Sequence, residues 1–113
     1  MSIYDDKPWL ARYAPGQPAE ITVEYDNAVV MFQATVERHP DADAIRYFDG
    51  RITFRGLDAL TDAFAAGLVE AGFGRGDRVA LYLQNVPQFV VAQLGTWKAG
   101  GIAVSINPMN RER

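Results

Sequence analysis

Residues that could do chemistry are scattered along this sequence, and few stand at the spacing that a reaction requires. The one glycine-rich loop reads Gly-Phe-Gly-Arg-Gly-Asp, from Gly72 to Asp77. A phosphate-binding loop of this kind follows a strand and opens onto a helix. This loop instead follows an expected helix and precedes an expected strand, and it lacks a Gly-Lys-Ser or Gly-Lys-Thr ending. We therefore interpret it as a helix-to-strand connection.

The charged candidates for metal binding or acid–base chemistry are also weak. His39 is the only histidine, and it stands beside a proline at an expected helix end, without a second ligand nearby. Glu37, Asp41 and Asp43 could act as paired carboxylates, but nothing in the sequence indicates a cleft around them. We favour an exposed helix terminus for His39 and a solvated loop for the three carboxylates.

Two hydroxyl residues and one aromatic patch complete the candidates. Neither Thr96 nor Ser105 stands beside a base within a nucleophile motif, so both are interpreted as packing positions. Trp9, Arg12 and Tyr13 could form an aromatic and cationic patch, but docking onto the protein's own surface is the simpler account. We therefore predict no catalytic, cofactor-binding or metal-binding residue in this chain.

Composition and charge are those of an ordinary globular protein. Of 113 residues, 49% are hydrophobic and 22% are charged, which argues against disorder. A net charge of −3 leaves no basic field for nucleic acid, and the absence of cysteine excludes disulfides and sulfur-ligated zinc. No apolar run approaches the roughly 20 residues that span a bilayer, and the N-terminus is not a signal peptide. We expect a cytoplasmic protein, and leave open peripheral contact with the inner membrane surface.

The N-terminal segment and the first helix differ sharply in composition. Residues 1–24 are rich in proline, glycine and isolated aromatics without a period, so we predict an arm without regular structure. Its aromatic residues Trp9 and Tyr13 are expected to hold it against a surface, because a free tail gains nothing from such groups. A helix is then predicted from an N-cap at Asp26 to His39, where the following proline disfavours helical backbone.

A β-hairpin and a second helix are expected next. Residues 44–54 predict the hairpin, and its dipeptide Asp49-Gly50 fits a two-residue type I′ turn. The second helix is predicted over residues 54–71, with Thr53 as its N-cap and Gly72 just past its end. Its apolar stripe consists of Leu57, Leu60, Phe64 and Leu68.

The last third of the chain predicts a strand, a helix and a strand. Consecutive apolar residues in 79–83 indicate a strand buried on both faces, which is typical of a parallel sheet, and residues 102–106 predict a second apolar strand. The helix between them is expected from Val86 or Pro87 to Ala99, with Lys98 in its final turn, where a cation suits the helix dipole. A right-handed crossover is the natural connection. The predicted fold is therefore α/β: a helix, a β-hairpin, a helix and a βαβ unit with parallel strands.

Four blocks of the sequence, in order, resemble motifs of the adenylate-forming family, which includes acyl-CoA synthetases and other AMP-binding enzymes. The family patterns are Leu-Thr-Tyr-x-Glu-Leu, Gly-Asp-Arg-Val-Ala, Pro-Asn-x-x-Glu-Phe and Leu-Lys-Ala-Gly-x-x-x-x-Pro. The matching blocks here lie at 52–57, 76–81, 84–89 and 97–108. The chain departs from the patterns at Gly56, Gln88, Gly101 and Ser105, none of which matches a catalytic position of the family.

The arm narrows the resemblance to bacterial long-chain fatty-acid–CoA ligases, whose opening is similar to residues 8–21. Residues 107–112 also resemble the stretch that follows their second motif. The resemblance implies an arm over 1–24 and, over 25–113, the first part of the large AMP-binding domain, truncated before its phosphate loop. It implies a parent enzyme that uses ATP, Mg²⁺ and CoA, and forms acyl-CoA, AMP and pyrophosphate through an acyl-adenylate. We expect the segment alone to be inactive.

Two other interpretations stay open. The parent could be a medium-chain or aryl acid ligase, or a peptide-synthetase adenylation domain, within the same chemistry. The chain could instead be a free-standing small protein that binds a partner without catalysis. In either case a pair of parallel strands without further neighbours exposes an edge and an apolar face. We therefore expect the chain to self-associate, for example by strand pairing.

Overall fold

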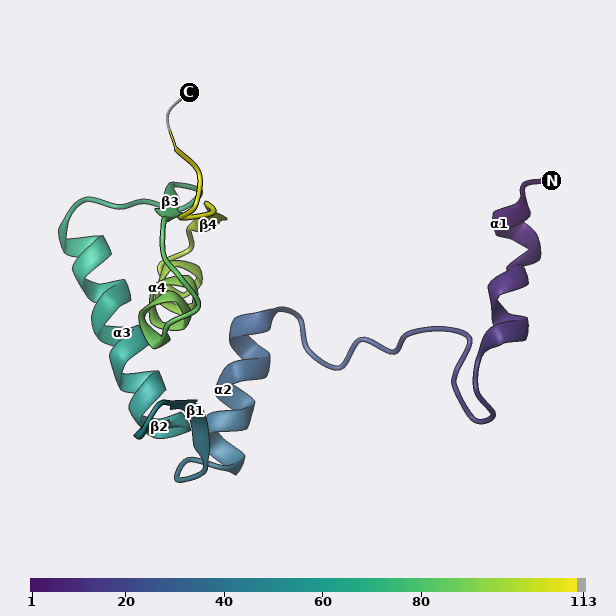
Figure 1. Ribbon diagram of the computed structural model, residues 1–113, viewed down its shortest axis with the longest axis horizontal. Coiled ribbons are helices and arrows are strands. Elements are labelled where there is room, and N and C mark those ends of the chain that lie inside the picture. Colours follow the sequence, from purple (N-terminus) through teal and green to yellow (C-terminus); the bar gives the residue numbers. More distant parts are fainter. Residues whose placement is uncertain (112–113) are drawn as a thin grey trace.

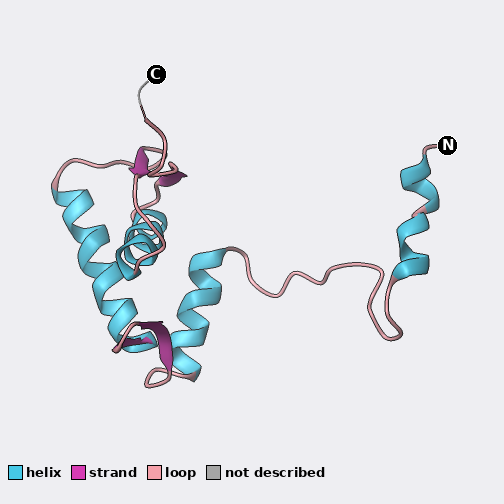
Figure 2. Ribbon diagram, viewed as in Figure 1, coloured by secondary structure: helices cyan, strands magenta, loops and turns pink. Residues whose placement is uncertain are grey.

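A computed structural model describes residues 1–111 of the chain. Within them, three longer helices form a body with four short strands: α2 (Ala28–Arg38), α3 (Phe54–Glu70) and α4 (Pro87–Lys98). A helical arm projects from this body (Figure 1). The strands form two separate pairs, β1 (Asp43–Tyr47) with β2 (Gly50–Thr53) and β3 (Arg78–Leu81) with β4 (Ile102–Ser105) (Figure 2). None of the helices in this part of the chain combines the length and the hydropathy needed to cross a membrane. The predicted α/β class and element order are confirmed.

The N-terminal arm contains two short helices, α1 (Ile3–Asp6) and the 3-10 helix η1 (Pro8–Arg12). Ser2 closes a capping box: its hydroxyl accepts from the Tyr4 N–H at 3.2 Å, and the Asp5 carboxylate accepts from the Ser2 N–H at 2.8 Å. The predicted absence of regular structure is wrong for these two helices, because local capping closes single turns that show no hydrophobic period; it is confirmed for residues 13–24.

The arm lies away from the body. The radius of gyration is 18.5 Å, whereas a compact chain of this length has about 13 Å. The Trp9 ring packs on Tyr4 within the arm, with 6.0 Å between ring centroids. Trp9 and Tyr13 remain 38% and 46% exposed. Trp9 thus finds an aromatic partner inside the arm itself, and the expectation that these residues hold the arm against the surface of the parent protein stays a prediction.

Helix α2 (Ala28–Arg38) begins one residue later than predicted. Its N-cap is Asn27, whose side-chain oxygen accepts from the Val30 N–H at 2.9 Å. Asp26 was the wrong choice because both residue types cap well, and only the backbone geometry selects between neighbours. The helix ends at His39, as predicted, and buries Phe32.

We expect Asn27→Ala to lower the free energy of unfolding by about 1 kcal/mol, the usual cost of losing an N-cap. Asp26→Ala is the matched control, and should change it by less than about 0.5 kcal/mol. Urea unfolding followed by circular dichroism measures both values. An equal loss in the two variants would show that the cap is not at Asn27.

The hairpin consists of β1 (Asp43–Tyr47) and β2 (Gly50–Thr53), paired antiparallel. Tyr47 pairs with Gly50, so the loop residues are Phe48 and Asp49. Phe48 has a positive φ of 50°, whereas the φ of Asp49 and the φ of Gly50 are not positive. The predicted type I′ turn at Asp49-Gly50 is therefore wrong, since that turn needs a positive φ at both central residues. Cross-strand pairing of Ile45 with Ile52, after a bulge, sets the register instead.

Helix α3 (Phe54–Glu70) begins where predicted and ends one residue earlier, with Ala71 as its C-cap. The Thr53 hydroxyl accepts from the Gly56 N–H at 3.1 Å. At the other end Gly72, with φ 90°, donates to the Val69 carbonyl, and the next residue, Phe73, donates to Leu68, both at 3.0 Å. These two bonds form a Schellman motif, which explains the sharp stop.

The buried face of α3 differs in part from the predicted stripe. Leu57 is buried and Phe64 and Leu68 are half-buried, but Leu60 is 46% exposed. Thr61 is fully buried instead, and its hydroxyl donates to the Asp58 carbonyl at 2.9 Å. The stripe was wrong at Leu60 because α4, which packs closely on α3, covers only part of the apolar arc.

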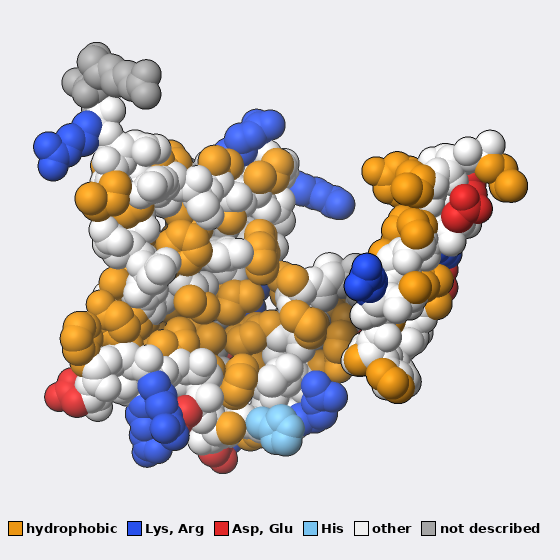
Figure 3. Space-filling view, turned by 45° about the vertical axis from the view of Figure 1, so that its right-hand side comes forward, with side chains coloured by type: hydrophobic (Ala, Val, Ile, Leu, Met, Phe, Trp, Pro, Cys, Tyr) orange, Lys and Arg blue, Asp and Glu red, His pale blue; other side chains and the backbone are white. Residues whose placement is uncertain are grey.

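Strands β3 (Arg78–Leu81) and β4 (Ile102–Ser105) are parallel, with α4 (Pro87–Lys98) between them in sequence. The βαβ unit is confirmed, although β3 ends at Leu81 rather than at residue 83. Burial on both faces, predicted for residues 79–83, is wrong for this chain: Leu81 is 2% exposed, but Ala80 is exposed, and Tyr82 and Leu83 are 55% and 37% exposed. Helix α4 contacts both strands and covers one face. Hydrophobic side chains are visible over the body surface and the arm in Figure 3.

Candidate functional site

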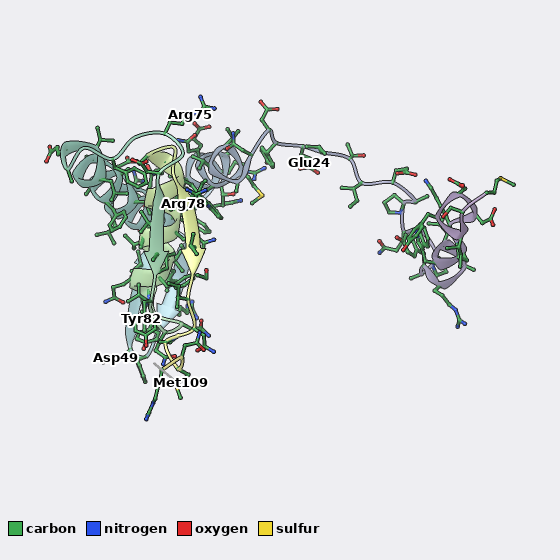
Figure 4. All side chains as sticks on the ribbon, turned by 90° about the horizontal axis from the view of Figure 1, so that it is seen from above. Glu24, Asp49, Arg75, Arg78, Tyr82 and Met109 are labelled. Atoms are coloured by element: carbon green, nitrogen blue, oxygen red, sulfur yellow. The ribbon has the colours of Figure 1, made fainter. Side chains whose placement is uncertain are left out.

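The glycine-rich loop is bonded to its own fold. The Asp77 carboxylate accepts from the Gly74 N–H at 2.7 Å. Gly76 donates to the Gly100 carbonyl at 2.9 Å, and Ile102 donates to the Asp77 carbonyl at 2.8 Å. The loop thus ties the end of α4 to the start of β3 and β4. Its interpretation as a helix-to-strand connection is confirmed, and Arg75 projects from it (Figure 4).

The structure does not bring the three predicted carboxylates together. Asp41 pairs with Arg55 at 3.1 Å, and Asp43 pairs with Arg46 at 2.8 Å, while Glu37 lies on α2. Asp43 belongs to β1 and its side chain is only 16% exposed, so the solvated-loop interpretation is wrong for it. Within residues 1–111 no three His, Cys, Asp or Glu side chains form a group that could hold a metal ion.

The remaining candidates are also dispersed. His39 is exposed at the C-cap of α2, as predicted. Thr96 is fully buried, and its hydroxyl donates to the Ala92 carbonyl at 2.6 Å, which confirms a packing role. Ser105 is exposed, so the packing role predicted for it is wrong; it is the last residue of β4, where the strand leaves the sheet.

A charged cluster that the sequence did not predict joins α3 to α4. Lys98, whose side chain is 7% exposed, places its Nζ 2.6 Å from a carboxylate oxygen of Asp58 and 2.6 Å from one of Asp62. It also donates to the Asp58 carbonyl at 3.3 Å. The ring centroid of Phe32, on α2, lies 5.4 Å from the same nitrogen. One side chain therefore links all three helices of the body.

The environment of Lys98 favours its charged form. Burial of the ammonium works against the charge, but its hydrogen bonds to the Asp58 and Asp62 carboxylates, together with their negative charges, outweigh this effect. The pKa of Lys98 is therefore raised above its ordinary value of 10.5. A lysine that acts as a base or nucleophile needs a lowered pKa. The Lys98 cluster is thus suited to holding helices together rather than to transferring protons.

At two glycines in the last third of the chain, an aromatic side chain lies so close to the backbone that a Cβ would not fit. A Cβ at Gly95 would lie 2.6 Å from Cδ1 of Phe64, so α4 packs directly on the α3 side chain. A Cβ at Gly101 would collide with the ring of Phe73, which belongs to the glycine-rich loop. The departure from the family pattern at Gly101 therefore has a packing reason.

An open cavity of about 760 Å³ lies between the first turn of α2 and the last turn of α4. Arg75 and Lys98 contribute charge to its lining, next to Trp97. The Lys98 ammonium is already bonded to Asp58 and Asp62. The cavity thus offers mainly apolar walls and the guanidinium of Arg75.

Comparison with known proteins identifies the family. The description "AMP-binding enzyme" matches residues 32–113, well over half of the chain. The chain belongs to the AMP-binding enzyme family. The match in this AMP-binding chain begins at Phe32, the buried residue of α2, and runs through the body. The family resemblance of the four sequence blocks is thereby confirmed.

Relatives of this AMP-binding chain include bacterial fatty-acid ligases. The long-chain-fatty-acid–CoA ligase of Escherichia coli O6:H1 is 40% identical over 109 residues, which cover 95% of this chain and 19% of the relative. That of Bacillus subtilis strain 168 is 40% identical over 108 residues, 94% of this chain and 19% of the relative. The chain therefore spans about a fifth of the length of the curated relatives it matches.

A solved structure shares the fold. The N-terminal subdomain of NpsA from Klebsiella oxytoca, in complex with anthranilyl-AMSN, is similar with a TM-score of 0.73 and 29% identity. The similarity covers 76% of this chain and 23% of that one. The α/β arrangement described above is thus that of the N-terminal part of adenylate-forming enzymes.

Proposed function

We propose that the protein to which this chain belongs is a long-chain fatty-acid–CoA ligase. The observation that carries the proposal is the 40% identity with two such ligases over nearly the whole chain, the arm included. The use of ATP follows from the family. Mg²⁺ and CoA complete the proposed reaction, in which ATP and a fatty acid form an acyl-adenylate and pyrophosphate, and the CoA thiol then displaces AMP.

In that reaction we assign to this chain the role of a scaffold. Its glycine-rich loop is bonded to the ends of α4 and β3, and Lys98 is held charged between two carboxylates. We therefore assign it no catalytic, cofactor-binding or metal-binding residue, and no nucleic-acid partner. The chain alone is proposed to be inactive.

Further parts of the proposal concern location and assembly. Exposed Ile102 and Val104, beside the open edges of β3 and β4, support self-association of the chain by strand pairing. Exposed aromatic residues of the arm, among them Tyr4 and Trp9, support peripheral contact with a membrane surface. The proposed location is the cytoplasm, at or near the inner membrane.

An aryl acid-activating enzyme is the second candidate. The similarity in fold to NpsA, whose structure holds anthranilyl-AMSN, favours it. The identity of 29% with NpsA is lower than the 40% with the long-chain ligases, which also match residues of the arm. For this reason we place the long-chain ligase first.

Two chimeras test the choice. In one, this chain replaces the matching segment of the Escherichia coli O6:H1 ligase; in the other, it replaces the matching segment of NpsA. We expect the first to form palmitoyl-CoA from ATP, CoA and palmitate with kcat/KM within about tenfold of the parent, a loss of about 1.4 kcal/mol. The second should lose far more of its parent's activity, because its neighbouring surfaces match this chain less well.

The controls separate folding from function. A Gly95→Leu version of the first chimera should lose activity through lost packing of α3 on α4. The chain alone, mixed with ATP, Mg²⁺ and palmitate, should release no pyrophosphate. A folded but inactive first chimera beside an active NpsA chimera would favour the aryl acid enzyme. Robust turnover by the chain alone would overturn the scaffold role.

A further inference from the structure

Tyr82 connects two segments that are far apart in the sequence. It follows β3, and its hydroxyl donates to the Pro108 carbonyl at 2.9 Å and to the Asn110 carbonyl at 3.1 Å. A phenol carries a single proton, so the two carbonyls share it in a three-centre bond. Figure 4 shows Tyr82 and Met109 near the same end of the β3–β4 pair.

The segment that Tyr82 holds is a closed turn over residues 107–110. The Asn110 N–H donates to the Asn107 carbonyl at 3.0 Å, and the Met109 N–H donates to the Asn107 side-chain oxygen at 2.9 Å. The turn thus has internal bonds of its own, and Tyr82 fixes its placement against the sheet. Met109 is 70% exposed at this turn.

The turn and Tyr82 lie at the carboxyl edge of the β3–β4 pair. Strands β3 and β4 are parallel, so their carboxyl ends meet at one edge, where Tyr82 leaves β3 and Ile106 leaves β4. Ile106 donates to the Leu81 carbonyl at 3.0 Å, which carries the pairing to that edge. Open α/β sheets bind their ligands in the crevice outside the carboxyl ends of the strands.

We propose that Tyr82 is a positioning residue of the ligase. Its hydroxyl holds the 107–110 turn at the carboxyl edge of β3 and β4, and the placement of that turn sets the affinity for the carboxylic acid substrate. The inference rests on the proposed function. Tyr82 acts through the turn, so its loss changes substrate binding and leaves the chemical step unchanged.

The first experiment measures how stably the 107–110 turn is held in the chain itself. Tyr82→Phe keeps the ring and removes only the donor. Amide hydrogen exchange at Met109 and Asn110 should become about three- to tenfold faster, in line with the loss of one net hydrogen bond. Tyr47→Phe, which removes the hydroxyl of an exposed tyrosine of β1, is the matched control and should leave these amides unchanged. Equal exchange in Tyr82→Phe and the unmodified chain would overturn the proposal.

The second experiment uses the chimera with the Escherichia coli ligase. Tyr82→Phe should raise KM for palmitate about three- to tenfold and leave kcat within about twofold. An unchanged KM, or an equal fall of kcat and kcat/KM, would overturn the positioning role. An inactive unmodified chimera counts against the proposed function, and the exchange experiment then decides whether Tyr82 holds the turn. An active chimera that Tyr82→Phe does not affect overturns this inference alone.

Discussion

Lys98→Met is expected to lower the free energy of unfolding by about 2–3 kcal/mol, because it removes the cation that Asp58 and Asp62 share. Methionine keeps most of the apolar stem, so the loss reflects the charge. Two carboxylates four residues apart on α3 would then face each other without a counter-charge. Breaking a fully buried ion pair costs about 3–5 kcal/mol. The expected loss is smaller here because the Asp62 side chain is 65% exposed, so water screens its charge and weakens its interaction with Lys98.

Urea unfolding followed by circular dichroism measures this loss. The matched control is Lys7→Met, which breaks the ion pair with Glu20 in the arm. Both partners of that pair are well exposed, at 43% and 76%, so its removal should leave the free energy of unfolding nearly unchanged. A loss for Lys98→Met no larger than that of the control would contradict the role of Lys98 in joining the helices.

Because of the Lys98 cluster, the free energy of unfolding should depend on pH in the alkaline range. The pKa of Lys98 is raised above 10.5 in the folded chain, so its stabilisation is fully present below the unfolded-state value and is lost as pH rises through the folded one. The unmodified chain should therefore lose its advantage over Lys98→Met above pH 10.5. Melting curves of both proteins across that range measure the difference, in which the titration of other groups cancels. A constant difference would show that Lys98 does not titrate with unfolding.

Gly95→Leu should destabilise the chain by about 3 kcal/mol, and Gly95→Ala by about 1–2 kcal/mol. A Cβ at this position would lie 2.6 Å from Cδ1 and 3.0 Å from Cβ of Phe64. The Phe64 ring can rotate, but its Cβ is fixed to the α3 backbone, so the two helices must move apart. Alanine gains about 1 kcal/mol of helix propensity over glycine, which offsets part of the cost for the smaller substitution.

Gly67→Ala is the matched control for Gly95→Ala. Gly67 lies on α3, and a Cβ there would have no neighbour within 4 Å. The substitution should therefore stabilise the chain by about 0.5–1 kcal/mol, through helix propensity alone. Chemical unfolding of both variants gives the comparison. Equal stabilisation by the two substitutions would show that α3 and α4 do not approach closely at Gly95.

The family and the order of the elements could be predicted from the sequence, because their signals are local. Thr53 and Gly72 bound α3 through bonds that reach only a few residues along the chain. The four sequence blocks identified the family for the same reason, since each is a short run of adjacent residues. The expectation that this chain holds no catalytic residue remains a prediction.

Predictions from the sequence were wrong where adjacent residues were equally suited to one position, such as a helix N-cap or a turn. Asp26 and Asn27 are both good caps, and the backbone entry into α2 selected Asn27. Asp49-Gly50 is a strong turn dipeptide, but the pairing of Ile45 with Ile52 set the register and moved the turn to Phe48 and Asp49. In each case the free energy of a larger element outweighs a local preference.

Contacts between elements could be decided only by the tertiary structure. Periodicity predicts that α3 has an apolar face, but the placement of α4 decides that Thr61 is buried and Leu60 is exposed. The bonds of Lys98 to Asp58, forty residues away, and of Tyr82 to Pro108, twenty-six away, have no sequence signature. A residue's spacing along its own helix or strand indicates the direction it faces. Its partner depends on how the elements pack, which no local pattern contains.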